Sequence, residues 1–216
     1  MNKGFFITLE GGEGAGKSIQ VEILTSHLRE EGYNVVVTRE PGGTRIGEQI
    51  RQITHNQENV DLDGKTEAYL MAAARAQHVA EVIQPSLDAG RVVVCDRFVD
   101  SSIAYQGYGR KLGPELIANL NSMAVNGAVP DLTILLDVPP HLGMKRRRTA
   151  EKSKDRLDLQ EADFYDRVYE GYRTLARTNS SRYLVIDAAK SIEAVAEQIW
   201  RAVKDRLEKH KGSLKK

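Results

Sequence analysis

Eight residues near the start of the chain carry the clearest chemical signal. Gly11-Gly12-Glu13-Gly14-Ala15-Gly16-Lys17-Ser18 matches G-x-x-x-x-G-K-[ST], a loop whose backbone N–H groups surround a polyphosphate. The glycines let the backbone approach the phosphates closely. We expect all eight residues to bind a nucleoside triphosphate, with Lys17 reaching its β- and γ-phosphates and Ser18 ligating Mg²⁺.

A second phosphate site is indicated by arginines that follow apolar runs. Asp96 comes directly after Val92-Val93-Val94-Cys95, so we expect it to face Mg²⁺ or its water shell. Arg97 is its neighbour, and it forms either a plain salt bridge or a bidentate contact to a phosphate. Arg39, Arg51 and Arg75 are further candidates for the same region.

Two more segments carry groups that suit a nucleotide. If a helix begins near Ser101, then Ser102, Tyr105 and Gln106 share a face, and Gln106 offers a donor and an acceptor to a base. A capped helix with incidental polar residues is the alternative. The arginine-rich segment 144–157 is either a solvated basic surface, a nucleic-acid patch or a mobile lid that brings an arginine to the transferred phosphoryl group.

Alternating apolar runs and helical patterns must position these residues. Five runs read as buried strands: Phe5–Glu10, Asn34–Thr38, Arg91–Asp96, Leu132–Val138 and Tyr183–Asp187. Helical spacing between them, as in Ile19–Glu31, Glu67–Ala89 and Ser191–Leu207, predicts an α/β fold with a five-stranded parallel sheet flanked by helices on both faces. Ligands bind at the carboxyl ends of such strands, where the motifs above lie.

Composition narrows the class of protein. We interpret the 216 residues as one domain, 1–216, whose last residues, 209–216, form a frayed tail. The net charge of +1 gives no general attraction to nucleic acid or to a membrane. The single cysteine, Cys95, reads as a core residue and favours a cytoplasmic location. The five histidines form no metal-like pattern and are expected at the surface or on a helix face.

Taken together, the motifs resemble the bacterial thymidylate kinase family of the nucleoside monophosphate kinase group, a P-loop NTPase fold. The resemblance covers about residues 4–190. The segments that carry it are the P-loop, Arg39-Glu40-Pro41-Gly42-Gly43, Asp96-Arg97-Phe98, Asp100-Ser101-Ser102, Tyr105-Gln106-Gly107 and Asp155-Arg156-Leu157-Asp158.

The resemblance implies that the γ-phosphoryl group of ATP moves to dTMP, with Mg²⁺, in a homodimer, for the synthesis of dTTP. Lys17, Asp96, Arg97 and a lid arginine would be catalytic. The implied dTMP-binding residues are Glu13 near the sugar 3′-hydroxyl, Arg39 and Arg97 near the phosphate, Arg75, Gln106 and Ser102 at the thymine, and Glu40, Arg51, Met71 and Tyr105 around them.

Two positions distinguish the chain from some members of the family that it resembles. The P-loop holds no arginine, so the chain resembles the class whose catalytic arginine lies in the lid, and we favour Arg148. Met71 stands where many relatives place an aromatic residue against thymine.

Two alternatives stay open on the sequence. One is another nucleoside monophosphate kinase or a deoxynucleoside kinase on the same fold. The other is a GTPase-type switch, because Asp61-Leu62-Asp63-Gly64 matches D-x-x-G, although the chain contains no N-K-x-D motif to read guanine.

Overall fold

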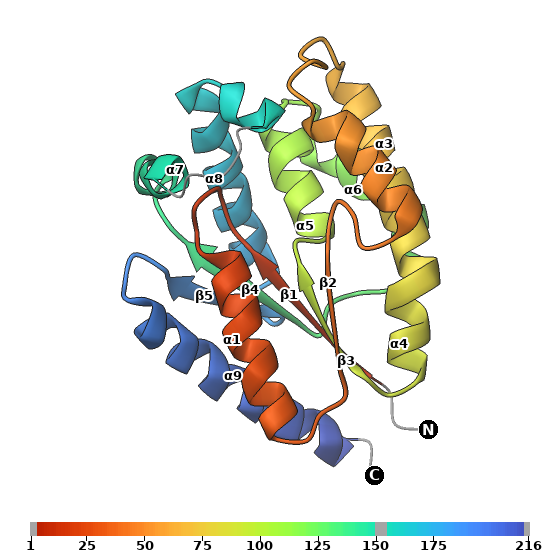
Figure 1. Cartoon of the computed structure of the whole chain (residues 1–216), viewed down its shortest axis with the longest axis vertical. Helices are drawn as coiled ribbons and strands as arrows, with labels where there is room; N and C mark the ends of the chain where they lie inside the picture. Colours follow the sequence, from red (N-terminus) through yellow and green to blue (C-terminus); the bar gives the residue numbers. More distant parts are fainter. Residues whose placement is uncertain (1–3, 150–154, 214–216) are drawn as a thin grey trace.

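The computed structural model describes residues 4–149 and 155–213 and has a single parallel sheet at its centre (Figure 1). The strand order is β2-β3-β1-β4-β5. The strands are β1 (Phe5–Glu10), β2 (Val35–Arg39), β3 (Val92–Asp96), β4 (Leu132–Asp137) and β5 (Tyr183–Asp187). The predicted α/β class and all five predicted strands are confirmed, with ends that differ by no more than one residue.

Helical segments connect the strands. They are α1 (Lys17–Glu30), α2 (Arg45–His55), α3 (Gly64–His78), η1 (Val79–Ile83), α4 (Gln84–Asp88), α5 (Val99–Ser102), η2 (Ile103–Gly109), α6 (Pro114–Val125), α7 (Pro140–Thr149), η3 (Arg156–Leu159), α8 (Ala162–Thr178) and α9 (Ile192–Ser213). The segments η1 and η2 are π-helical turns, which occur often at functional sites, and η3 is a 3₁₀ helix.

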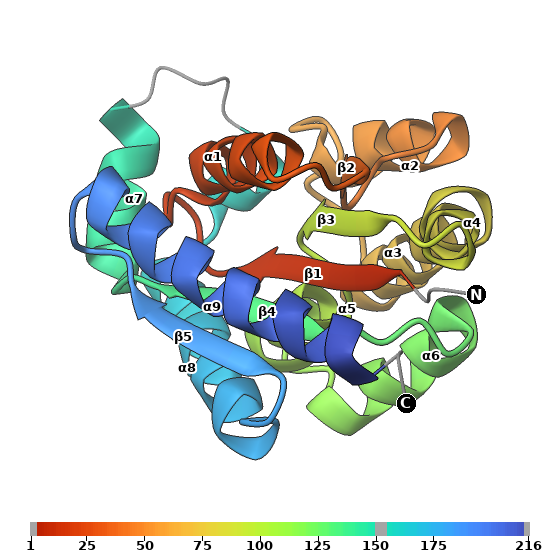
Figure 2. The same cartoon turned by 90° about the horizontal axis from the view of Figure 1, so that it is seen from below.

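Alternation along the strands explains the two helical layers. Ile7 and Leu9 of β1 pack on α1 and α9, whereas Phe6 points to the opposite face and packs on η1 and α4. Successive side chains of a strand face opposite sides, so apolar residues at every position predict burial on both faces. Figure 2 shows α9 crossing in front of the sheet and α8 behind β5, and α1 packs in the same core cluster as α9.

The order of the strands creates the cleft. The connection after β1 leads through α1 to β2, at one edge of the sheet. The connection after β3 runs the opposite way across the strand order, to β4 beyond β1. Neighbouring strands whose connections diverge leave a crevice at their carboxyl ends, where ligands bind. The P-loop follows β1 at this point, Asp96 ends β3, and Arg97 follows it.

The carboxyl end of the chain differs from the prediction. Instead of fraying over 209–216, helix α9 continues to Ser213, and residues 214–216 lie outside the described part. The His210 ring packs edge-on against Phe5 at 5.1 Å, and the Lys211 ammonium lies 4.2 Å from the centre of the Tyr33 ring. These contacts hold the last turns of α9 against Phe5 of β1 and against Tyr33, which precedes β2. Across the described residues, no helix combines the length and apolar character needed to cross a bilayer.

Candidate functional site

The P-loop turns the chain from β1 into α1 and places Lys17 at the first helical position. Gly16 precedes it with φ 87°, a left-handed conformation that favours glycine. The Lys17 ammonium donates to the carbonyl oxygens of Gly11 and Gly12 at 3.0 and 2.9 Å. Burial, together with the positive charge of Arg97, lowers the pKa of Lys17 to about 8. Phosphate oxygens at this loop would restore the charged form.

The predicted metal ligands meet at the cleft. Ser18 Oγ donates to Asp96 Oδ2 at 3.2 Å, which brings a hydroxyl and a carboxylate oxygen to one point beside the loop. Among the described residues, no group of three or more His, Cys, Asp or Glu could hold a metal by itself. A hydroxyl and one carboxylate fit Mg²⁺, which usually keeps waters and phosphate oxygens as its remaining ligands.

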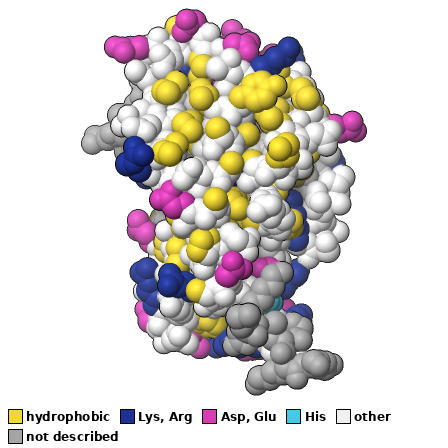
Figure 3. All heavy atoms as spheres, turned by 90° about the vertical axis from the view of Figure 1, so that its right-hand side faces the viewer, with side chains coloured by type: hydrophobic (Ala, Val, Ile, Leu, Met, Phe, Trp, Pro, Cys, Tyr) yellow, Lys and Arg dark blue, Asp and Glu magenta, His cyan; other side chains and the backbone are white. Residues whose placement is uncertain are grey.

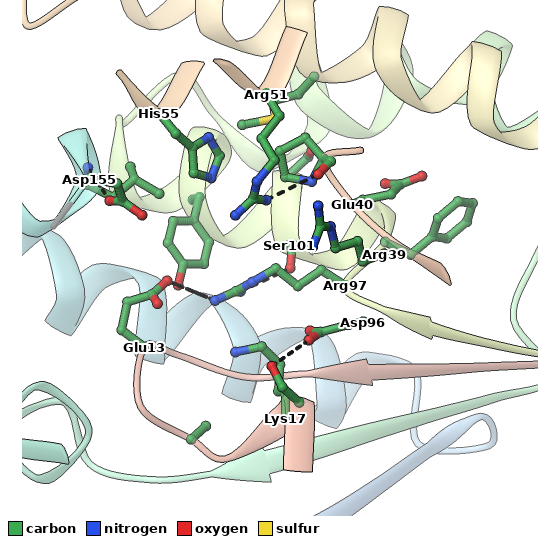
Figure 4. A pocket seen from close by; sticks show the side chains of 18 of the residues that line it. Glu13, Lys17, Arg39, Glu40, Arg51, His55, Asp96, Arg97, Ser101 and Asp155 are labelled. Atoms are coloured by element: carbon green, nitrogen blue, oxygen red, sulfur yellow. Dashed lines mark hydrogen bonds and ion pairs between the residues drawn. The ribbon is translucent and has the colours of Figure 1, made fainter. Parts of the chain in front are cut away.

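Arg97 lies in the middle of the cleft and pairs with the P-loop. Its guanidinium contacts Glu13 Oε1 at 2.8 Å, and it also donates to Gly11 O and to the hydroxyls of Tyr105 and Tyr172. Figure 4 shows the Glu13 and Arg97 side chains pointing toward each other. Burial alone would raise the pKa of Glu13, but Arg97, Lys17 and the Tyr105 hydroxyl hold it at about 2, so the carboxylate is ionised.

Two more arginines approach the same space from the β2 side. Arg39, at the end of β2, donates from one terminal nitrogen to both carboxylate oxygens of Glu48 at 3.0 Å, and Arg51 of α2 donates to Pro41 O at 3.1 Å. Burial and the nearby Arg39 charge lower the pKa of Arg51. Three guanidinium groups from β2, α2 and the end of β3 thus converge, as expected for a site that receives an anion.

Arg75 of α3 is almost fully buried and heavily bonded. Its Nε donates to Glu40 Oε2 at 2.8 Å, one terminal nitrogen donates to Ser102 Oγ and to Asn121 Oδ1, and the other donates to Phe98 O. The carbonyl oxygen of a base that binds to Arg75 would therefore share a donor with one of these acceptors or replace it.

Glu40 is itself fully used by protein partners. Its second oxygen lies 2.9 Å from Nδ1 of His78, whose Nε2 lies 2.6 Å from the Thr38 hydroxyl. The sequence assigns Glu40 to the acceptor nucleotide. The residue lines the cavity, and its bonds to Arg75 and His78 show that it also holds Arg75 in place.

The predicted shared face after Arg97 is present. Ser102, Tyr105 and Gln106 all line one cavity, although the backbone forms the π-helical η2 rather than an α-helix from 103 onward. Gln106 Nε2 donates to Glu67 Oε1 at 2.7 Å. Met71 lies in the same wall, so the base end of the cavity has a thioether side chain in that position.

A cavity of about 530 Å³ joins these parts. Its wall includes every predicted site residue except the lid arginine Arg148 and two P-loop glycines, Gly11 and Gly12. The P-loop therefore opens into the same space as the arginine cluster and the Gln106 end.

The lid arginines differ in where they point. Arg147 lines the cavity and pairs with Asp158 at 2.9 Å, and Arg146 lines it while donating to Ala188 O at 2.7 Å. Arg148, which the sequence favoured, is exposed and lines a separate groove between α7 and α8. The structure therefore does not bring Arg148 to the cavity. Residues 150–154 of the predicted lid lie outside the described part.

Residues that were not among the candidates from the sequence also surround the cavity. His55 and Asp155 line it, and burial together with Arg51 lowers the pKa of His55 to about 4, so its ring is neutral. Glu67 and His78 lie behind it, both fully buried. His78 lies on helix α3, which the expectation of a surface or helix-face position allows, but its side chain is fully buried. The helical spacing that groups Glu67 with Met71 and Arg75 extends to His78 and was the available signal.

Comparison with known proteins identifies a family. The thymidylate kinase family model matches residues 9–199. A thymidylate kinase of Geobacillus thermodenitrificans (strain NG80-2) is 50% identical over 95% of this chain and 92% of its own length. One of Bacillus pumilus (strain SAFR-032) is 44% identical over 96% of this chain and 98% of its own. The crystal structure of thymidylate kinase from Ehrlichia chaffeensis superposes with a TM-score of 0.76 at 34% identity, covering 94% of this chain and 99% of that one.

The lowered pKa of Lys17 predicts how nucleotide affinity depends on pH. Bound phosphates favour the charged ammonium, whereas the free protein loses that proton near pH 8. Affinity for a non-hydrolysable ATP analogue should therefore fall as pH rises through 8, approaching about tenfold per pH unit above it. Calorimetric titration between pH 7 and 9.5 measures this. Lys17→Arg stays charged throughout, so its weaker binding should be flat; an equal slope in that variant would assign the titration to another group.

Proposed function

The chain belongs to the thymidylate kinase family, and we infer on that premise that it transfers the γ-phosphoryl group of ATP to the 5′-phosphate of dTMP, giving dTDP and ADP. One observation supports this activity above the others. A single cavity connects a P-loop to a cluster of three arginines and ends at an amide and a buried arginine that suit a base. Two phosphate sites in one cavity are what phosphoryl transfer between nucleotides needs.

Positioning and charge neutralisation supply the catalysis, because the acceptor is already a phosphate oxyanion. We propose that the P-loop N–H groups and Lys17 hold the donor phosphates, and that Arg39, Arg51 and Arg97 hold the acceptor phosphate. Ser18 and Asp96 would hold Mg²⁺, which when bound neutralises charge on the donor phosphates. The ionised Glu13 accepts hydrogen bonds only, so it suits the sugar 3′-hydroxyl.

The alternatives lose support in the structure. Asp61, the acid of the D-x-x-G match, is exposed and does not line the cavity. Asp63 within the same segment accepts from the backbone N–H groups of Lys65 and Thr66, so the segment serves to cap α3. A comparison of acceptor substrates distinguishes the proposed reaction from that of another nucleoside monophosphate kinase or a deoxynucleoside kinase.

The proposed cytoplasmic location rests on the one cysteine, Cys95, which is free and buried.

An assay of ADP release with dTMP, dUMP, dCMP, dGMP and thymidine tests the proposed reaction. We expect dTMP to be the best acceptor, because an arginine, a serine and an amide line the base end of the cavity. Lys17→Ala should lower turnover by about two or more orders of magnitude while the circular dichroism spectrum stays unchanged. Another acceptor with a higher kcat/KM than dTMP would overturn the substrate assignment, and near wild-type turnover in Lys17→Ala would overturn the P-loop assignment.

We propose that Arg147, rather than Arg148, is the lid arginine that acts on the transferred phosphoryl group. Arg147→Ala should lower kcat by about 10²–10³-fold, whereas Arg148→Ala should stay within a few-fold of wild type. Asp158→Asn is the matched control, since it breaks the same ion pair and keeps the guanidinium. The reverse ranking of the two arginine variants, measured as kcat at saturating substrates, would restore Arg148.

We propose a homodimer formed through the face built by α2, α3 and α6. Figure 3 shows apolar side chains gathered on this side of the molecule. The exposed large apolar residues on these three helices include Ile46 and Ile53 on α2, Tyr69 on α3 and Met123 on α6, of which Tyr69 is 64% and Met123 89% exposed. Large apolar side chains gathered on one face are typical of protein interfaces.

Light scattering coupled to gel filtration tests the dimer. The wild-type protein should elute at twice the 24.1 kDa mass of the chain, and Tyr69→Glu should shift it toward the monomer, because a charge in an apolar interface loses its hydration. Ile192→Glu, at an exposed apolar residue on α9, is the control and should leave the mass unchanged. A monomeric wild type, or a dimer that Tyr69→Glu leaves intact, would contradict this interface.

A further inference from the structure

We propose that Glu67, a carboxylate behind the cavity wall, fixes the orientation of the Gln106 amide and thereby selects bases that present a ring N–H. The inference rests on the proposed function, because it concerns how the acceptor base is read. Glu67 does not line the cavity, so it would act as a positioning residue and not as a contact of the substrate.

Three donors converge on the Glu67 carboxylate. Gln106 Nε2 donates to Oε1 at 2.7 Å, Arg110 donates to Oε2 at 3.1 Å, and Arg156 pairs with the same oxygen. The side chain is fully buried. Burial alone would raise the pKa of Glu67, but Arg110, the Gln106 amide and Arg156 outweigh it and leave the pKa lowered. Glu67 is therefore ionised at neutral pH.

An ionised carboxylate accepts hydrogen bonds and donates none. The Gln106 amide must then turn its NH₂ end toward Glu67, because its carbonyl oxygen would meet another acceptor in the reverse orientation. No other described residue holds the amide: none donates to Gln106 Oε1, and the side chain lines the cavity. The carbonyl oxygen is thus the group that a bound base meets.

A carbonyl oxygen discriminates between pyrimidines. Thymine and uracil carry a ring N–H that can donate to it, whereas cytosine carries an unprotonated ring nitrogen at the same position. Two acceptors facing each other in a closed cavity leave both without a partner, which disfavours binding. Free rotation of the amide would remove this selection, since the NH₂ end would then serve cytosine. The fixed charge of Glu67 prevents the rotation.

Glu67→Gln tests the proposal, because it removes the charge while the volume of the side chain stays nearly the same. We expect the ratio of kcat/KM for dTMP to that for dCMP to fall by about 10- to 100-fold. The ratio of dTMP to dUMP should stay within twofold, because both bases present the same N–H. Thermal unfolding reports any loss of stability. Glu67→Asp is the second variant: it keeps the charge opposite both arginines but retracts the carboxylate from Gln106, so the first ratio should fall there too.

A double-mutant cycle separates positioning from general damage. In a Gln106→Ala background, Glu67→Gln should leave the dTMP-to-dCMP ratio unchanged, because the amide that it orients is gone. Asp100→Asn is the control for losing a buried carboxylate: Asp100 is equally buried and pairs with Arg182 at 2.7 Å. That variant should lower stability without changing the ratio.

The outcomes distinguish this inference from the proposed function. A wild-type protein that prefers dTMP, combined with an unchanged ratio in Glu67→Gln and Glu67→Asp, overturns the role of Glu67 and leaves the kinase assignment standing. An equal fall of the ratio in the Gln106→Ala background overturns it as well. A wild-type protein that does not prefer dTMP to dCMP overturns the proposed function and this inference with it.

Discussion

The ion pair between Glu13 and Arg97 is the interaction on which the cavity depends. It joins the loop after β1 to the residue after β3, 2.8 Å apart, so it links the P-loop to the arginine cluster across the cavity. Arg97 adopts φ 72°, a conformation that residues other than glycine rarely adopt, and its N–H donates to Leu9 O at 3.0 Å. Local backbone strain of this kind is held by the surrounding structure and often occurs at functional sites. Here it directs the guanidinium back across the cleft to the P-loop.

A cavity that receives two phosphorylated molecules needs several positive charges close together, and unpaired buried charges are unstable. The structure resolves this conflict for its most buried arginines, Arg75 and Arg156, by pairing each with a carboxylate from another element. Glu40 of the segment after β2 pairs with Arg75 of α3 at 2.6 Å, and Glu67 of α3 pairs with Arg110 and Arg156. These pairs also fix geometry, because a bonded guanidinium or amide has few orientations left.

Local sequence patterns predicted the sheet, the P-loop and the face shared by Ser102, Tyr105 and Gln106, since strand alternation and helical spacing are short-range signals. They could not predict partners that are distant in the chain. Arg156 and Glu67 are 89 positions apart, and neither residue type alone indicates the other. The π-helical turn at Ile103–Gly109 was also beyond an argument from α-helical spacing. The fold could therefore be predicted from the sequence, and so could most of the residues that line the cavity. The ion pairs that support those residues could not be predicted.

The choice between Arg147 and Arg148 shows what fixes such details. Helix α7 lies against the P-loop through two glycines: a Cβ on Gly143 would stand 2.2 Å from Glu13 O, and one on Gly14 would stand 2.0 Å from Gly143 O. This close approach sets which face of α7 meets the loop. Residues three and four positions along a helix lie on the same face, so Arg146 and Arg147 follow Gly143 toward the cavity. Arg148, five positions along, turns away into the groove toward α8. Because a helix rotates by about 100° per residue, a contact at Gly143 decides the orientation of an arginine one turn later.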